Sequence, residues 1–92
     1  MVLKKNIKIY TTENCGYCKK AKALLNLYNA DYKELVIKNG KERNIMTTLS
    51  GGKRTVPQIF INDLNIGGYD EMHSLHKDGD LKKLLIWTIG RK

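Results

Sequence analysis

Long hydrophobic runs, cysteines and prolines are all scarce in this 92-residue sequence, which has two cysteines and one proline. Two cysteines cannot build the disulfide framework of a small secreted domain. The longest apolar run, residues 84–87, is far shorter than the roughly 20 residues that a membrane-spanning helix needs. No apolar segment follows the N-terminal charges, so no secretory signal is predicted. We therefore expect a soluble, cytoplasmic protein.

Acidic residues are also few, because nine Asp and Glu stand against seventeen Lys and Arg, for a net charge of +8. A chain of 10.5 kDa has room for one domain, over residues 1–92. The excess of positive charge makes nucleic-acid binding one hypothesis. However, the cations are spread from end to end, and the seven aromatic residues form no stacking motif. A basic solvated surface that attracts small anions and acidic partner faces is therefore favoured.

The two cysteines stand together as Cys15-Gly16-Tyr17-Cys18. A zinc site would need two further ligands, and the histidines, His73 and His76, lie far downstream at a spacing that zinc fingers do not use. No metal site is predicted. A cytosolic pair at this spacing is a redox dithiol if a βαβ pattern surrounds it, and otherwise a pair of structural thiols.

Hydrophobic periodicity supplies the βαβ pattern. Alternation over residues 7–10 predicts a strand, and apolar residues at helical spacing predict a helix from near Cys15 to near Asn29. Residues 32–37 predict a second strand, which a connection of this length can place parallel to the first. A second, weaker helix is indicated around residues 45–49.

The second half of the chain predicts a β-hairpin and two helices. Residues 56–61 form the first hairpin strand, with proline at its start, and residues 64–66 return. A third helix runs from Tyr69 to its end at Gly79, and Asp80 is the expected N-cap of a last helix. The residues expected to face inward from that helix are Leu81, Leu84, Leu85 and Trp87. The predicted fold is α/β, with a four-stranded mixed sheet flanked by helices in a thioredoxin-like arrangement.

Three motifs in this order resemble the glutaredoxins. They are Tyr10 leading to Cys15-Gly16-Tyr17-Cys18, then Thr55-Val56-Pro57-Gln58-Ile59-Phe60-Ile61, and then Ile66-Gly67-Gly68-Tyr69-Asp70. The likeness covers essentially the whole chain. It implies a glutaredoxin fold and a glutathione-dependent thiol–disulfide oxidoreductase.

The chemistry of the dithiol can be argued from its place in the chain. Exchange requires a thiolate, and at a helix start Cys15 would face unpaired N–H groups and the positive end of the helix dipole. Lys19 or Lys22 could add positive charge. Cys18, three residues on, shares that face and lies within disulfide reach, so Cys15 is the expected nucleophile and Cys18 the resolving thiol. Two inert structural cysteines are the alternative.

The other two motifs take their roles from the resemblance. Pro57, otherwise an ordinary strand-edge proline, would be cis and face the thiols, with the Val56 backbone pairing with the substrate as a short added strand. Gly68, Tyr69 and Asp70, otherwise a turn and helix cap, would bind the γ-glutamyl end of glutathione. The expected glutathione-binding residues are Tyr17, Val56, Pro57, Gly68, Tyr69 and Asp70, whereas Tyr28 and Tyr32 are expected to serve packing.

Two positions depart from the family pattern. Gly16 stands where many dithiol members have proline, which predicts a changed redox poise of undetermined direction. Thr12 stands where many have a lysine, so the glycine carboxylate of glutathione needs another cation. Lys53, Arg54 and Arg43 are candidates, and all three could equally be solvated.

The expected partners are glutathione and proteins with glutathionylated cysteines or disulfides, among them ribonucleotide reductase, and a monomer is expected. One alternative is a redoxin that is recharged by thioredoxin reductase. Another, which relatives with a small residue at position 16 suggest, is a carrier of a [2Fe-2S] cluster held between two protomers by Cys15 and glutathione. A nucleic-acid-binding domain is disfavoured by the scattered charge.

Overall fold

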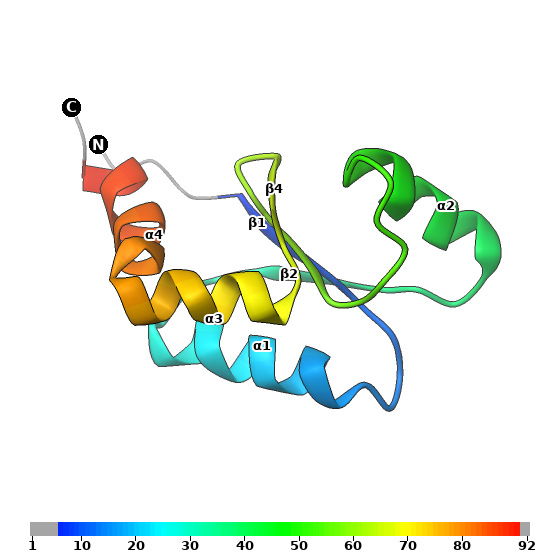
Figure 1. The fold of residues 1–92 in the computed structure, drawn as a ribbon, viewed down its shortest axis with the longest axis horizontal. Helices are drawn as coiled ribbons and strands as arrows, with labels where there is room; N and C mark the ends of the chain where they lie inside the picture. Colours follow the sequence, from blue (N-terminus) through cyan, green and yellow to red (C-terminus); the bar gives the residue numbers. More distant parts are fainter. Residues whose placement is uncertain (1–5, 91–92) are drawn as a thin grey trace.

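The computed structural model describes residues 6–90, with side chains through residue 85. The elements in chain order are β1 (Ile7–Thr11), α1 (Gly16–Leu27), β2 (Lys33–Val36), α2 (Gly40–Leu49), β3 (Gln58–Ile61), β4 (Leu64–Gly67), α3 (Tyr69–Asp78) and α4 (Asp80–Gly90). The strands form one sheet in the order β2-β1-β3-β4 (Figure 1). β1 and β2 are parallel, and the other two pairs are antiparallel. This confirms the predicted mixed sheet.

One main core lies between the sheet and three of the helices. Alternate residues of β1 point to opposite faces, and Ile7 and Ile9 are buried while Lys8 and Tyr10 are partly exposed. The core cluster takes its residues from β1, β3, α1, α3 and α4: Ile7, Ile9, Ala21, Leu24, Leu25, Ile59, Ile61, Met72, Leu81 and Leu85. α2 contributes none of them, and Figure 1 shows this helix set apart from the other three.

The element boundaries differ from the prediction by a few residues, each for a local reason. β3 begins at Gln58 instead of residue 56, because Pro57 has no N–H for the ladder and the pairing with β1 ends at Tyr10–Gln58. α1 ends two residues early, with Asn29 in the left-handed region at φ 56°. α2 begins well before its apolar residues, because the Asn39 side chain caps its first turn.

The C-terminal helices follow the prediction closely. Gly79, at φ 84°, ends α3 in the left-handed conformation that glycine tolerates best. Asp80 is the first residue of α4 instead of its N-cap. Leu81 and Leu85 are buried as expected, whereas the side chain of Trp87 lies outside the described residues. Within residues 6–90, no helix is long and apolar enough to cross a membrane.

Candidate active site

The two cysteines meet at the start of α1. Cys15 is the N-cap residue, with extended backbone angles, and its Sγ accepts a hydrogen bond from the Cys18 N–H at 3.1 Å. The two sulfurs are joined in a disulfide, with the Cα atoms 5.2 Å apart. Cys18 is buried, at 1% exposure, whereas Cys15 is partly exposed. The predicted difference between an accessible first thiol and a covered second one is confirmed.

Hydrogen bonds to β2 and to the residue that follows it hold Thr11, the last residue of β1, from which the chain leads to the dithiol. The Thr11 hydroxyl donates to Glu34 Oε2 at 2.7 Å, and the Ile37 N–H donates to the Thr11 carbonyl at 2.8 Å. The Thr11 hydroxyl and then the Lys22 ammonium hold the pKa of Glu34 below its usual value. Lys22 Nζ lies 2.9 Å from Glu34 Oε2. Of the two lysines predicted to add positive charge beside Cys15, Lys22 is therefore held in an ion pair with β2.

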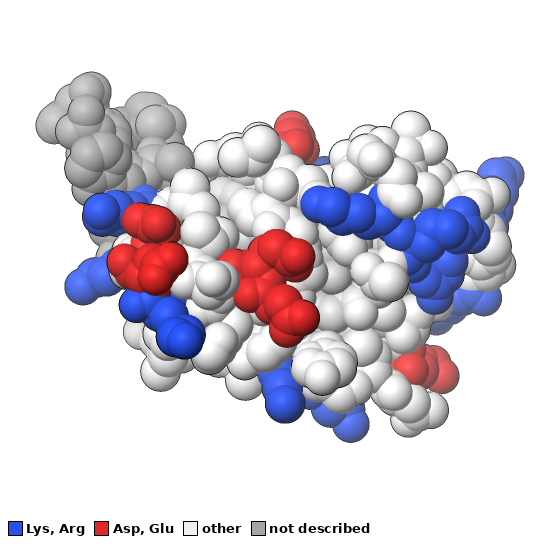
Figure 2. All heavy atoms as spheres, in the orientation of Figure 1, with Lys and Arg blue, Asp and Glu red and all other residues white. Residues whose placement is uncertain are grey.

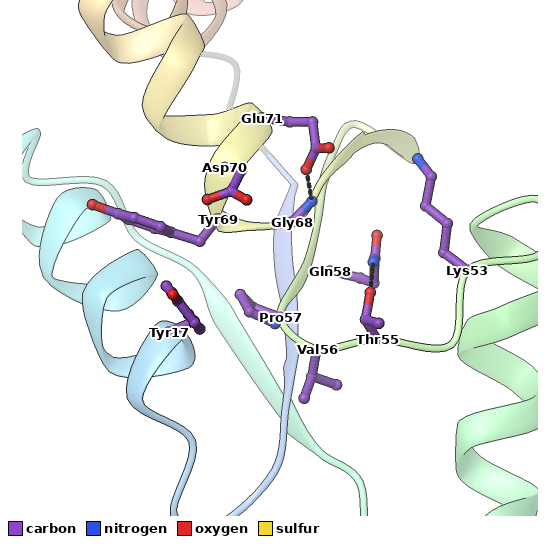
Figure 3. A pocket seen from close by; sticks show the side chains of 10 residues that line it. All are labelled: Tyr17, Lys53, Thr55, Val56, Pro57, Gln58, Gly68, Tyr69, Asp70 and Glu71. Carbon is purple, nitrogen blue, oxygen red and sulfur yellow. Dashed lines mark hydrogen bonds between the residues drawn. The ribbon is translucent and has the colours of Figure 1, made fainter.

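A cavity of about 450 Å³ opens beside the dithiol, within the range typical of small-molecule sites (Figure 3). Its lining residues are Tyr17, Lys53, Thr55, Val56, Pro57, Gln58, Gly68, Tyr69, Asp70 and Glu71. All six residues predicted to bind glutathione are among them. Cys15 and Cys18 do not line the cavity, but Tyr17, which stands between them in the chain, does. The fold thus brings residues of α1, the loop before β3 and the start of α3 to one hollow.

Gly68 allows the start of α3 to approach the loop before β3, and Gly67 leaves room for the Glu71 side chain. A Cβ added at Gly68 would lie 3.1 Å from the carbonyl oxygen of Pro57. Gly67 has φ 107°, and a Cβ there would lie 2.9 Å from the Glu71 side chain. Glu71 Oε1 in turn accepts the Gly68 N–H at 2.8 Å, which is the bond that the glutamate of a capping box makes to the N-cap backbone. The Val56–Pro57 peptide bond is cis, as the resemblance predicted.

Aromatic rings form one wall of the cavity. The ring centroids of Tyr17 and Tyr69 are 6.0 Å apart, and those of Tyr69 and His73 are 5.5 Å apart. Lys20 Nζ lies 5.2 Å from the Tyr17 ring centroid, on its face. Tyr17 is nevertheless 58% exposed, so its ring remains open to a bound molecule. Tyr28, which was predicted to serve packing, packs against the core and also makes a 2.6 Å hydrogen bond with His76 Nδ1.

A chain of polar side chains forms the opposite wall. Lys53 Nζ donates to Asn65 Oδ1 at 2.9 Å, and Asn65 Nδ2 donates to Gln58 Oε1 at 3.1 Å. Gln58 Nε2 then donates to Thr55 Oγ1 at 3.3 Å. Because the Thr55 oxygen accepts from Gln58, its own hydroxyl proton is free to be donated to a ligand. Figure 3 shows Lys53 and Tyr17 at opposite sides of the cavity.

The sequence interpretation had not assigned Thr55, Gln58 or Glu71 to the site. For two of them, the sequence position indicates a specific role. Gln58 is a polar residue within an apolar strand and is only 1% exposed, which indicates a positioned side chain. Glu71 stands three residues after the N-cap position, where a capping box places glutamate. Of the three candidate cations, only Lys53 lines the cavity.

Comparison with known proteins shows the family to which this dithiol and this fold belong. The family model for glutaredoxins matches residues 7–66. The chain belongs to the glutaredoxin family. Glutaredoxin 1 of Rickettsia typhi is 48% identical over 81 residues, which cover 86% of this chain and 78% of that protein. Glutaredoxin 3 of Escherichia coli is 41% identical over 80 residues, which cover 87% of this chain and 96% of that one.

A solved buckwheat glutaredoxin–glutathione complex matches the structure with a TM-score of 0.79 and 28% sequence identity, covering 88% of this chain and 76% of that one. Family membership makes Cys15 and Cys18 the redox-active pair of a general thiol oxidoreductase. Among the described residues, no three His, Cys, Asp or Glu side chains are grouped so that they could hold a metal ion.

Proposed function

We propose that this glutaredoxin family member is a glutathione-dependent thiol–disulfide oxidoreductase that reduces glutathionyl mixed disulfides and protein disulfides. One observation carries the proposal: the six residues that the resemblance assigns to glutathione come from three separate segments and line a single cavity beside the dithiol. In this scheme Cys15 is the nucleophile and Cys18 resolves. The protein acts as a cytoplasmic monomer on partners of the ribonucleotide reductase kind.

The γ-glutamyl end of glutathione would lie at the start of α3. Its carboxylate suits the N–H groups of a first helical turn, which have no acceptor within the helix. Its ammonium suits Asp70, an exposed carboxylate without an ion-pair partner among the described residues. The close approach of Gly68 to Pro57 supports this placement, because it sets the helix start beside the loop that receives the peptide.

The cysteinyl part of glutathione would pair with the backbone N–H and C=O of Val56 as a short added strand. Pro57 follows with no N–H of its own, and Tyr17 covers the sulfur from the α1 side. In this scheme Lys53 binds the glycine carboxylate, because Arg43 and Arg54 do not line the cavity. Asn65 holds the Lys53 ammonium in place, which supports this choice.

The chemistry follows two routes. In the monothiol route, the Cys15 thiolate attacks the glutathione sulfur of a mixed disulfide, the old S–S bond breaks, and the substrate leaves as a thiolate that takes up a proton. A second glutathione thiolate then attacks the Cys15 mixed disulfide and releases oxidised glutathione. In the dithiol route Cys15 attacks a protein disulfide, and Cys18 displaces the bound protein to form the Cys15–Cys18 disulfide. Two glutathione molecules then reduce it.

The protein environment supports Cys15 as the attacking sulfur. The Cys18 N–H already points at Cys15 Sγ, and such a hydrogen bond favours negative charge on that atom. Cys18, buried at the first turn, is reached by the neighbouring sulfur more easily than by a bulky substrate.

The test is reduction of the mixed disulfide between glutathione and 2-mercaptoethanol, coupled to glutathione reductase and NADPH. Activity should survive Cys18→Ser and vanish with Cys15→Ser, because the monothiol route needs only Cys15. Reduction of a protein disulfide should need both residues. Wild-type protein that is inactive here, but is reduced by thioredoxin reductase, would contradict the proposal and favour the redoxin alternative.

A further inference from the structure

Positive charge gathers over α2 and the loop that follows it. Residues 38–57 contain five cations and one carboxylate, Glu42, and the cations are Lys38, Lys41, Arg43, Lys53 and Arg54. The ion pairs among the described residues are Lys22–Glu34 and Lys83–Asp80, so none of these five has a carboxylate partner. Figure 2 shows this basic region over α2, with acidic side chains gathered instead over α3 and the start of α4.

The same helix exposes apolar side chains. Ile45 is 51% exposed and Leu49 is 57% exposed. With Lys41 they occupy every fourth position of α2 and therefore share one face. They line a shallow hollow of about 340 Å³, and Ile45 also borders a groove of about 400 Å³ toward β2, which Lys38 lines.

Two arginines fix this surface to the loop that enters the cavity of about 450 Å³ beside the dithiol, here called the redox cavity. A guanidinium nitrogen of Arg43 donates to the Arg54 carbonyl, and Arg54 Nη1 donates to Asn44 Oδ1 at 3.1 Å. Asn44 lines the hollow beside Ile45. Lys53, which precedes Arg54, lines the redox cavity itself. The α2 region and the redox cavity are therefore joined by one short hydrogen-bonded segment.

We infer that Lys38, Lys41, Ile45, Leu49 and Arg54, here called the α2 surface, dock an acidic segment with aliphatic side chains in the protein whose disulfide is reduced. Carboxylates of that segment pair with these cations, which have no carboxylate partner in the described part of the chain, and its aliphatic side chains cover Ile45 and Leu49. This inference rests on the proposed function, because it adds a recognition surface for protein substrates beside the same redox cavity.

An acidic polypeptide fits this surface better than a nucleic acid or a membrane. The hollow on α2 is lined by no aromatic side chain on which a base could stack or that could anchor at a lipid interface. Tyr10, which lines the groove toward β2, packs edge-to-face against Phe60. Phosphate groups would satisfy the cations but leave Ile45 and Leu49 uncovered. The polar Asn44 and Thr48 share their hollow, which is poorly suited to burial among lipid chains.

The test uses two synthetic peptides, each with one glutathionylated cysteine, a Gly/Ser linker and a ten-residue segment. In one peptide this segment is made of Glu and Leu, and in the other of Lys and Leu. The value of kcat/KM for reduction of the peptide mixed disulfide, with glutathione as the reductant and the free peptide thiol as the measured product, is compared at low and high salt for wild type, Lys38→Glu/Lys41→Glu and Ile45→Ser/Leu49→Ser. Matched controls are Lys77→Glu/Lys82→Glu, on exposed residues of α3 and α4, and Leu64→Ser, 62% exposed on β4.

We expect wild type to prefer the Glu/Leu peptide by about tenfold at low salt, with the preference falling as salt rises. The double Lys→Glu variant should lose or reverse this preference, and the Ile45/Leu49 variant should lower it while both controls retain it. Equal rates with the two peptides would overturn the inference, as would an equal loss in the controls. So would Lys38- and Lys41-dependent binding to single-stranded DNA or phosphatidylserine vesicles without any peptide preference.

The small mixed disulfide of glutathione and 2-mercaptoethanol separates the two hypotheses. All these variants should reduce it as wild type does, because none removes a residue that lines the redox cavity. If wild type fails to reduce it, the proposed function fails. If wild type reduces it but shows no peptide preference, only the docking inference fails.

Discussion

Replacing Asp70 with asparagine tests the proposed γ-glutamyl site most directly. The change keeps the size of the side chain at the start of α3 and removes only its negative charge. Two unit charges 4 Å apart interact by about 1 kcal/mol in bulk water and about 4 kcal/mol near a protein surface. Asp70 is exposed, so we take the lower value, which corresponds to a rise of about fivefold in the KM for glutathione.

The kcat of this Asp70→Asn variant should change little, because sulfur exchange takes place at Cys15 and not at α3. N-acetylglutathione lacks the ammonium, so wild type should use it about fivefold less well than glutathione, and Asp70→Asn should not distinguish the two thiols. Rates are followed by chromatography, since glutathione reductase would itself discriminate between the products.

Asp78→Asn, at the other end of α3, is the matched control and should leave the KM unchanged. If Asp78→Asn raised the KM as much as Asp70→Asn, the reasoning would be refuted. Equal rates of wild type with N-acetylglutathione and with glutathione would also refute the reasoning.

Four further predictions concern other parts of the chain. Thr12→Lys should lower the KM for glutathione, because it supplies a second cation for the glycine carboxylate. An unchanged KM in this assay would indicate that Lys53 already binds this carboxylate by itself. Gly67→Ala should destabilise the protein by about 1–3 kcal/mol in thermal unfolding, because its φ of 107° and the contact at 2.9 Å both oppose a Cβ; Gly40→Ala, with open space around it, should have little effect. Glu34→Gln should lower stability to urea at pH 7 by up to about 1 kcal/mol. Because folding lowers the pKa of Glu34, this loss should shrink as the pH falls below 4.5 and the native carboxyl becomes protonated; a difference that persisted there would contradict an electrostatic origin. Finally, the purified protein should stay colourless after anaerobic reconstitution with iron, sulfide and glutathione, and visible absorption bands would instead favour the cluster alternative.

Most of the element order could be predicted because local patterns specify it. The alternation in β1, the spacing of Ala21, Leu24 and Leu25 in α1, and Gly79 after α3 all act within a few residues. One boundary that differed has both a local cause and a distant one. β3 starts at Gln58 because Pro57 has no N–H for the ladder and because the pairing with β1 ends at Tyr10, a partner that residues 56–61 by themselves do not indicate.

The sequence by itself determined the dithiol, its place at a helix start and the family, because three motifs in order are specific enough for that. Tertiary structure decided which charges remain available. Lys22 forms an ion pair with Glu34, which is brought beside it by the pairing of β2 with β1. Lys53 reaches the redox cavity while Arg43 and Arg54 tie the loop to α2. Long side chains find partners across the fold, so their roles depend on distances that local sequence does not encode.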